Sequence, residues 1–274
     1  MNNFANSVTI ITGGGSGIGR ALAIKMAELG AKVHLLGLKE DLLEDVTELI
    51  TNQGGISEFR HVDVSDYVRL KEAIEGIYEQ QGNIDYLFNN AGITLLAEAQ
   101  NIDIERWQKI VDINLMGVIN GIQITYPIMV EQGYGHIVNT ASLAGITGYP
   151  TSAAYAATKS AVIQLTQDLR LEGQGYGVNF SVVCPGYVKT NIFEGDKIIG
   201  GNMENTLKQI PFRMISPEQA AESILKGVNK NKSRIVFPAY AKFTALIQRL
   251  CPFLLIPISK KLVTDFRANT TGTN

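Results

Sequence analysis

Tyr155 and Lys159 carry groups that could exchange a proton with a substrate, and they lie four residues apart in a stretch that reads as helix. Residues at i and i+4 share one face of a helix, so the phenol and the ammonium should be neighbours. A free tyrosine has a pKa of about 10, and an adjacent ammonium lowers that pKa toward the working range. Ser142 ends an apolar, strand-like run and could hold a carbonyl or hydroxyl oxygen beside the phenol. The three residues predict proton transfer coupled to another step.

A second pair with the same spacing, Tyr67 and Lys71, serves as an internal control. It lies in the charged stretch 66–75, and no serine-bearing strand precedes it. We interpret it as a solvated helix face. Spacing alone therefore does not define a catalytic pair, and Tyr155 needs support from elsewhere in the chain.

A glycine-rich turn near the N-terminus gives that support. The apolar run 8–11 leads into Thr-Gly-Gly-Gly-Ser-Gly-Ile-Gly at residues 12–19, and a helical pattern follows. Glycines in such a turn let the backbone approach a pyrophosphate, whose charge is met by the N–H groups at the helix start. No Gly-Lys-Ser/Thr follows, which argues against a nucleoside-triphosphate P-loop. A turn of this kind at the first strand-to-helix junction predicts a dinucleotide site.

With both features, the chain resembles the short-chain dehydrogenase/reductase family from about Val8 to Ile192, with further similarity to about Phe237. Besides the glycine turn, three motifs fit in the expected order: Asp63-Val64, Asn89-Asn90-Ala91-Gly92 and Pro185-Gly186. The family's catalytic tetrad matches Asn114, Ser142, Tyr155 and Lys159. The resemblance implies cofactor contacts by Gly13, Gly15, Ser16, Gly17, Ile18, Gly19, Leu38, Lys39, Asp63, Val64, Asn90, Ala91, Gly92, Tyr155, Lys159, Pro185, Gly186, Val188 and Thr190.

The chemistry implied by this resemblance is reversible hydride transfer between a nicotinamide cofactor and a carbonyl or secondary alcohol. Tyr155 would donate or remove the proton, and Ser142 would hydrogen-bond the substrate oxygen. By resemblance, Lys159 would also bind the nicotinamide ribose, and Asn114 would hold a water that links Lys159 to solvent.

The choice of cofactor depends on the end of the second apolar run, residues 33–39. An acidic residue there commonly holds the ribose 2′-hydroxyl of NAD, and a basic one accommodates the 2′-phosphate of NADP. Gly37 stands where NAD-using members often carry Asp, while Ser16 and Leu38 stand where NADP-using members often carry a cation. Lys39 remains as the candidate cation, or else is an ordinary exposed lysine. We predict NADP over NAD.

The fold class follows from alternating patterns. Strand candidates lie at 8–11, 32–36, 59–62, 84–88, 136–140, 178–184 and 234–237, and most are separated by helical patterns. Strands that alternate with helices indicate a doubly wound parallel α/β sheet of the Rossmann type, with helices on both faces. Ligands bind such sheets at the carboxyl ends of the strands. The glycine turn, Asp63, Asn90, Ser142 and Pro185 all fall at these ends.

Composition bounds the remaining possibilities. At 274 residues, 45% hydrophobic and 18% charged, the chain is expected to form one domain over residues 1–274. A net charge of −2 without a basic tract argues against a nucleic-acid partner. The two cysteines and three histidines are scattered, so no metal site is predicted. The N-terminal apolar run breaks into glycines, so we expect no secretory signal and a cytoplasmic location.

Two regions outside the motifs bear on substrate and partners. Residues 187–216 are predicted to cover the substrate. Their apolar side chains either favour a hydrophobic substrate or only pack this region on the sheet. These apolar residues are Ile192, Phe193, Ile198, Ile199, Met203, Ile210, Phe212 and Met214. Residues 238–268 form an apolar extension whose core, 243–258, is shorter than the roughly 20 residues that span a bilayer. No transmembrane span is expected, although this extension could rest on a membrane surface or pack on the domain.

The long helical stretches 104–131 and 152–171 carry surplus apolar surface, which predicts a homodimer or a dimer of dimers. Three alternatives to a simple dehydrogenase stay open. They are a regulator that binds NAD(P) without turnover, an isomerase or dehydratase that uses nicotinamide transiently, and a membrane-surface reductase of lipid ketones.

Overall fold

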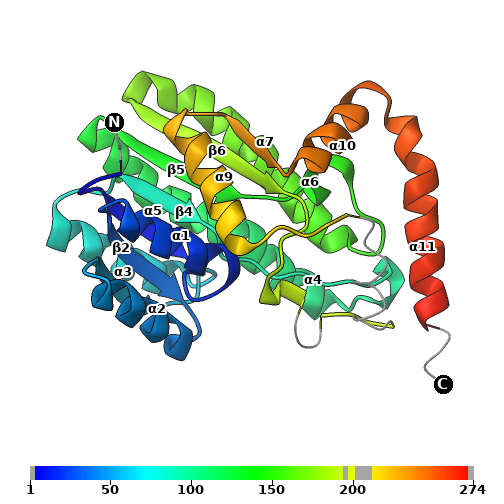
Figure 1. Cartoon of the computed structure of the whole chain (residues 1–274), viewed down its shortest axis with the longest axis horizontal. Coiled ribbons are helices and arrows are strands. Elements are labelled where there is room, and N and C mark those ends of the chain that lie inside the picture. The colour runs from blue at the N-terminus through cyan, green and yellow to red at the C-terminus, as the bar shows by residue number, and fades with distance from the viewer. Residues whose placement is uncertain (1–3, 194–196, 201–211, 271–274) are drawn as a thin grey trace.

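Seven parallel strands form one sheet in the order β3-β2-β1-β4-β5-β6-β7 (Figure 1). The computed structural model describes residues 4–193, 197–200 and 212–270. The strands are β1 Val8–Thr12, β2 Lys32–Gly37, β3 Ile56–His61, β4 Tyr86–Asn89, β5 Gly135–Thr140, β6 Val178–Pro185 and β7 Arg234–Phe237. The chain runs outward from β1 to β3 and then restarts at β4 on the other side of β1. The switch in strand order therefore lies between β1 and β4, where such sheets bind ligands.

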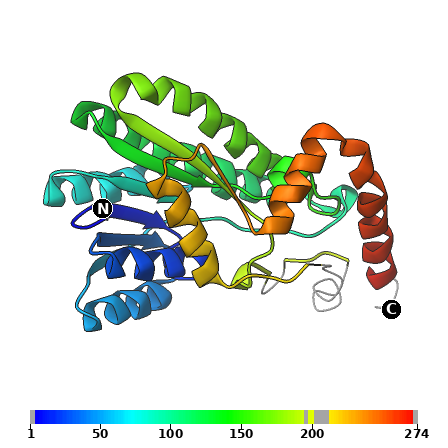
Figure 2. The ribbon, with the colours of Figure 1, turned by 45° about the horizontal axis from the view of Figure 1, so that its top comes forward.

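Helices cover both faces of this sheet (Figure 2). The α-helices are α1 Gly17–Glu28, α2 Glu40–Asn52, α3 Tyr67–Gln81, α4 Ile104–Val111, α5 Gly117–Gln132, α6 Ala144–Thr147, α7 Ala153–Gly173, α9 Pro217–Asn229, α10 Ala239–Leu250 and α11 Ile256–Thr270. The short helices are η1 Ala99–Asn101, the π-helix η2 Asp112–Met116, η3 Gln174–Tyr176, η4 Asn191–Phe193 and η5 Pro252–Leu255.

The two faces have separate apolar cores because successive strand residues point to opposite sides. On β1, Ile11 packs with residues of α1, α2 and α9, whereas Ile10 packs with residues of α3, α5 and α7. Both side chains are fully buried, and burying such a side chain contributes roughly 1.5–3 kcal/mol. Strands buried on both faces read as continuous apolar runs, which is why the sequence could predict them. The predicted doubly wound α/β fold is confirmed.

Two strands begin two or more residues away from the predicted start, and the other boundaries agree within one residue. β3 begins at Ile56, three residues before the predicted start, because an edge strand tolerates the polar residues Ser57 and Glu58 that hid it. β4 begins at Tyr86 instead of residue 84. The N–H of Ile84 donates to Oε1 of Gln132 at 2.8 Å and so has a side-chain partner outside the sheet.

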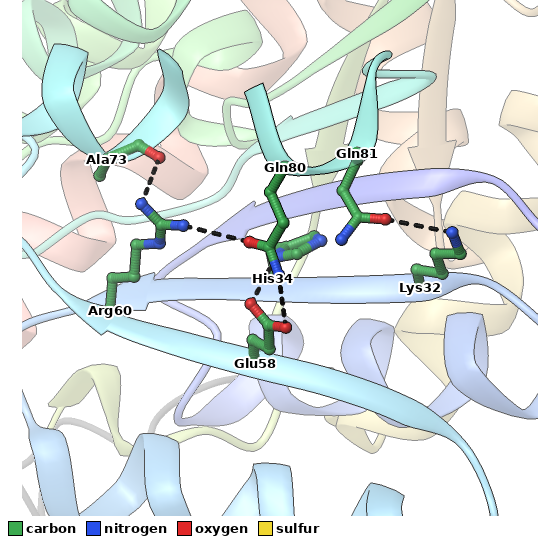
Figure 3. A network of polar contacts seen from close by, with 7 residues as sticks. All are labelled: Lys32, His34, Glu58, Arg60, Ala73, Gln80 and Gln81. Atoms are coloured by element: carbon green, nitrogen blue, oxygen red, sulfur yellow. Dashed lines mark hydrogen bonds and ion pairs between the residues drawn. The ribbon is translucent and has the colours of Figure 1, made fainter. Parts of the chain in front are cut away.

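Polar contacts fasten α3 to the β2–β3 edge of the sheet (Figure 3). Gln80 on α3 donates to Glu58 on β3 at 2.8 Å, and Arg60 on β3 donates to the carbonyl of Ala73 on α3 at 3.2 Å. His34 on β2 lies 3.8 Å from the Glu58 carboxylate, and burial lowers the pKa of His34. These contacts join β2, β3 and α3 at this edge of the sheet.

The continuous helical run from Ile104 to Gln132 is long and apolar enough to cross a bilayer by length and composition. Half of its most apolar window is buried inside the domain. The core helix of a globular domain meets the same criteria, so this run is weak evidence for a membrane span.

Candidate active site

The candidate residues gather at the carboxyl edge of the sheet. Thr12, the last residue of β1, holds this edge together. Its hydroxyl oxygen accepts the N–H groups of Asn90 and Ala91, each at 3.0 Å, and the Asn90 side chain donates to the Thr12 carbonyl at 3.2 Å. The ends of β1 and β4 are thus joined at the point where the strand order switches.

The turn after β1 has a backbone conformation that depends on its glycines. Gly13 and Gly17 have positive φ angles of 66° and 52°, which favour glycine. A Cβ on Gly19 would collide with the carbonyl oxygen of Gly13. Ser16 caps α1 without a side-chain hydrogen bond, and the first turn of that helix carries no acid. The helix N-terminus can therefore receive an anion through its backbone N–H groups.

The end of β2 lies beside this turn, and the end of β3 lies beside the end of β2. Leu38 is 53% exposed, and the exposed Lys39 precedes the first residue of α2. Asp63 accepts two hydrogen bonds from Ser65, from N–H at 2.9 Å and from the hydroxyl at 2.7 Å, which fix its carboxylate. Asp63 also lines a cavity of about 520 Å³ that α4 borders. The carbonyl of Val64 accepts from Asn120 of α5 at 2.9 Å.

Asn114 lies in the π-helix η2, between α4 and α5, and its side chain is fully buried. Its amide oxygen accepts the N–H of Ile93 at 2.8 Å, and its amide nitrogen donates to the carbonyl of Ile93 at 2.9 Å. The same nitrogen lies 3.4 Å from the hydroxyl of Thr158 on α7. Asn114 therefore ties the loop after β4 to α7. Single turns of π-helix within α-helices are frequent at functional sites.

Ser142, Tyr155 and Lys159 come together between β5 and α7. Lys159 is 3% exposed. Its ammonium donates to the carbonyl of Thr140 at 2.8 Å and lies 5.8 Å from the centroid of the Tyr155 ring. Burial lowers the pKa of Lys159 to about 8. Burial raises the pKa of Tyr155, and a hydrogen bond with Ser142 opposes that rise.

This direction differs from the expectation that a neighbouring ammonium would lower the pKa of Tyr155. Removal of the phenol from water disfavours the phenolate, and this effect prevails in the free protein. The hydrogen bond that the ammonium donates goes to the carbonyl of Thr140.

The control pair behaves as the sequence indicates. Tyr67 is 44% exposed, and the ammonium of Lys71 pairs with Glu75 at 2.6 Å on the surface of α3. Tyr155 and Tyr67 thus share a spacing to lysine but differ in burial and in neighbours.

The segment after β6 returns to the glycine turn. The carbonyl of Pro185 accepts the N–H of Leu143, next to Ser142, at 2.8 Å. Val188 forms a β-bridge with Ile215. Thr190 lies against the glycine turn, because a Cβ placed on Gly17 would lie 3.1 Å from the methyl group of Thr190. Gly186 abuts the hydroxyl of Tyr240. Every predicted site residue therefore lies along one edge of the sheet, at the strand ends or in the segments that follow them.

Comparison with known proteins identifies the family. The sequence model of the short chain dehydrogenase family matches residues 7–197. The chain belongs to the short-chain dehydrogenases.

Two relatives are each 35% identical to this short-chain dehydrogenase. An uncharacterized oxidoreductase of Listeria innocua aligns over 82% of this chain and 91% of its own, and a 3-oxoacyl-[acyl-carrier-protein] reductase of Thermotoga maritima over 80% and 88%. A short-chain dehydrogenase/reductase of Burkholderia phymatum, solved in complex with NAD, has a TM-score of 0.84 at 27% identity and covers 93% of this chain and 96% of its own. The protein is thus an NAD(P)-dependent oxidoreductase.

The dehydrogenase has an aromatic cluster that the sequence did not single out. The hydroxyl of Tyr187 donates to that of Tyr149 at 3.0 Å, and the hydroxyl of Tyr240 accepts the N–H of Tyr187 at 2.6 Å. Phe212 stacks on Tyr240 at 4.1 Å between ring centroids. Tyr187 lies in the region 187–216 that is predicted to cover the substrate, and Tyr149 lies between Ser142 and α7. The position of Tyr187 in that region is the only sequence signal that could have indicated the cluster.

The predicted covering region, 187–216, is described in part. Ile198 forms a bridge with Leu96, and Ile199 packs against the small apolar cluster that includes Leu95 and Ile110. Two residues of the predicted apolar set, Met203 and Ile210, lie outside the described residues.

Proposed function

We propose that this dehydrogenase interconverts a carbonyl compound and a secondary alcohol, with Tyr155 as the general acid and base. The observation that carries the proposal is the grouping of Ser142, Tyr155 and the buried Lys159 beside a turn that fits a pyrophosphate. The nicotinamide cofactor, when bound, supplies or accepts the hydride. Gly13, Gly17 and Gly19 would hold its pyrophosphate at the start of α1.

Each of the four side chains of the site would have a separate role in the reaction. Because the pKa of Tyr155 is raised, its phenol stays protonated at neutral pH, which suits proton donation to a substrate oxygen during reduction. The Ser142 hydroxyl would hydrogen-bond the same oxygen. Lys159 would contribute positive charge near the phenol and contact the cofactor ribose. Asn114 would keep the loop after β4 and α7 at a fixed separation, through its bonds to Ile93 and Thr158.

NADP is the proposed cofactor. Gly37 leaves no carboxylate at the end of β2 to oppose a 2′-phosphate, and the exposed Lys39 follows two residues later. A basic side chain at this strand end accommodates the additional phosphate. Calorimetry with NADPH and NADH tests the assignment, and NADH binding as tight as that of NADPH contradicts it.

The substrate is proposed to be hydrophobic. Phe212, Ile198 and Ile199 belong to the covering region, and the tyrosine cluster adds aromatic surface close to Pro185. The Thermotoga relative is named for an acyl substrate, which is compatible with this chemistry. A panel of apolar ketones and their alcohols, followed by the absorbance of reduced cofactor, would identify the class.

The dehydrogenase is also proposed to be a homo-oligomer. Large apolar side chains stay exposed along the long helices, including Ile104 at 73%, Met116 at 41% and Leu171 at 70%. Contiguous exposed apolar surface marks interfaces. Light scattering that returned the 29.8 kDa mass of one chain at micromolar concentration would contradict the proposal.

The decisive test replaces Tyr155 with Phe. The ring volume stays, but the proton is lost, so turnover should fall by roughly 10²–10⁴-fold while cofactor binding is retained. Lys159→Ala should lose both turnover and cofactor affinity.

Tyr67→Phe is the matched control, because it removes the hydroxyl of the exposed tyrosine that shares the spacing to lysine. It should leave turnover unchanged. Near-normal turnover of Tyr155→Phe with an identified substrate would refute the assignment. Cofactor binding without turnover of any substrate by the unmodified protein would favour a regulatory role.

A further inference from the structure

The C-terminal helices leave an unusual concentration of apolar side chains exposed. Seven of the seventeen large apolar residues that are exposed in the described part of the chain lie between Phe243 and Ile258. Phe243 and Leu250 are each 65% exposed, and Phe253 is 63% exposed. We call these seven residues, on α10, η5 and the start of α11, the C-terminal apolar patch. Figure 1 shows the two helices at one end of the molecule, beyond α6 and α7.

The patch has a defined face on α10. Phe243, Leu246 and Leu250 follow the i, i+3, i+7 spacing of one helix face, and the opposite side carries the buried Ala241. Lys242 and Arg249 are exposed and lie, by the periodicity of a helix, at one margin of this apolar stripe. Long cationic side chains can lie along apolar surface while their charges reach a polar layer.

The charge around the patch has one sign. Residues 238–264 contain four cations, Lys242, Arg249, Lys260 and Lys261, and no carboxylate, in a chain whose net charge is −2. All four are exposed. Lys261 is 3.9 Å from Asp265, whereas the other three form no ion pair with a residue that the structure describes. The surface that covers this patch must therefore be both apolar and anionic.

We propose that the C-terminal apolar patch docks on an anionic membrane surface. An interfacial segment combines large apolar side chains with flanking lysines and arginines, which meet acidic headgroups. A second copy of the chain is a poorer occupant, because a two-fold interface would set this cationic face against itself. Pro252 and Pro257 interrupt the segment, so it lies on the bilayer and does not cross it.

The C-terminal apolar patch borders the segment that follows Ser142. A cavity of about 580 Å³ lies between η5 and the segment after Ser142, with Thr147 and Pro150 on one side and Phe253 and Ile256 on the other. An ion pair between Arg267 and Glu98, at 2.5 Å, fastens α11 to the loop after β4. The patch is thereby held against the domain and not on a free tail. Docking itself does not depend on the proposed reaction.

Co-sedimentation of the full chain with vesicles tests the proposal. Vesicles of phosphatidylcholine with an equal part of phosphatidylglycerol should bind the protein at low salt, and vesicles of phosphatidylcholine alone should not. High salt should weaken the binding, since the cationic contribution is screened. Lys242→Gln and Arg249→Gln should each weaken partitioning roughly fivefold. Phe253→Ser with Leu254→Ser should abolish it without change in the melting temperature, because both side chains are exposed.

Val68→Ser with Arg69→Glu provides the matched control on α3, where Val68 is 62% exposed and Arg69 is exposed. This variant should bind anionic vesicles as the unmodified protein does. Absence of binding to anionic vesicles at low salt would overturn the proposal. A second outcome would also overturn it: the protein does not bind vesicles, and changing Phe253 and Leu254 lowers its oligomeric mass. A second copy of the chain would then cover the patch.

Discussion

The ammonium of Lys159 lies 5.8 Å from the centroid of the Tyr155 ring, one helical turn away on α7. Its own hydrogen bond goes to the carbonyl of Thr140, at 2.8 Å, at the end of β5. The backbone of the sheet therefore fixes the position of the charge relative to the Tyr155 ring. An arrangement of this kind depends on how α7 packs on β5, and small shifts in either element should change the chemistry.

The first prediction concerns the pH dependence of the proposed reduction. Burial lowers the pKa of Lys159 to about 8, so its positive charge is present below that pH and is lost above it. If the charge is needed, kcat/KM should fall about tenfold per pH unit above pH 8, because kcat/KM reports the ionisation of the free enzyme. A profile that stays flat to pH 9.5 would show that the charge of Lys159 is dispensable.

The second prediction uses Gly92, above which the Asn114 and Lys159 side chains converge. A Cβ at this position would lie 3.1 Å from the amide oxygen of Asn114 and 3.3 Å from the ammonium of Lys159. Gly92→Ala should therefore displace both groups by a few tenths of an ångström and lower turnover at least tenfold, with a loss of about 1 kcal/mol in stability. Gly175→Ala is the control, because a Cβ there meets nothing within 4 Å. Equal activity of the two variants would contradict this account.

The sequence predicted those parts of the site that depend on local pattern. The glycine turn and the pair of Tyr155 and Lys159 could be recognised because each is contained within one strand-to-helix junction or one helix. The paired bonds between Asn114 and Ile93 could not, since they join segments that only the folded sheet brings together. The raised pKa of Tyr155 was missed for the same reason: burial is a property of the packed fold and not of the sequence neighbours.

The third prediction tests cofactor choice at the end of β2. A Cβ on Gly37 would make ordinary contacts with Leu43 at 3.5 Å and beyond, and Gly37 has no positive φ angle, so an aspartate fits there. Gly37→Asp should weaken NADPH binding at least tenfold by repelling the 2′-phosphate, and it should preserve or strengthen NADH binding. Lys39→Ala should weaken NADPH binding alone. Unchanged NADPH affinity in both variants would place the 2′-phosphate elsewhere.

The fourth prediction concerns stability at mildly acidic pH and centres on His136 of β5. Its Nε2 atom lies 2.8 Å from the hydroxyl of Ser181, which itself donates to the carbonyl of Lys232 at 2.6 Å. Because the serine proton is committed to Lys232, Nε2 must carry the histidine proton, and the neutral ring has only Nδ1 left to protonate. Burial, with Arg170 nearby, lowers the pKa of His136 to about 4.

The linkage between proton binding and folding gives the direction in which stability changes with pH. Between pH 6.5 and about 4 the unfolded chain binds a proton at this histidine that the folded chain does not, so stability falls as the pH falls through this range. The full loss is about 3 kcal/mol, from 1.36 kcal/mol per pKa unit. Urea midpoints at pH 7 and pH 5 should therefore differ less in His136→Gln than in the unmodified protein, whatever the variant's absolute stability. His61→Gln removes an exposed histidine of β3 and should keep the original difference. If both variants retain it, the loss of stability arises elsewhere, and the buried His34, whose pKa burial also lowers, is the next residue to change.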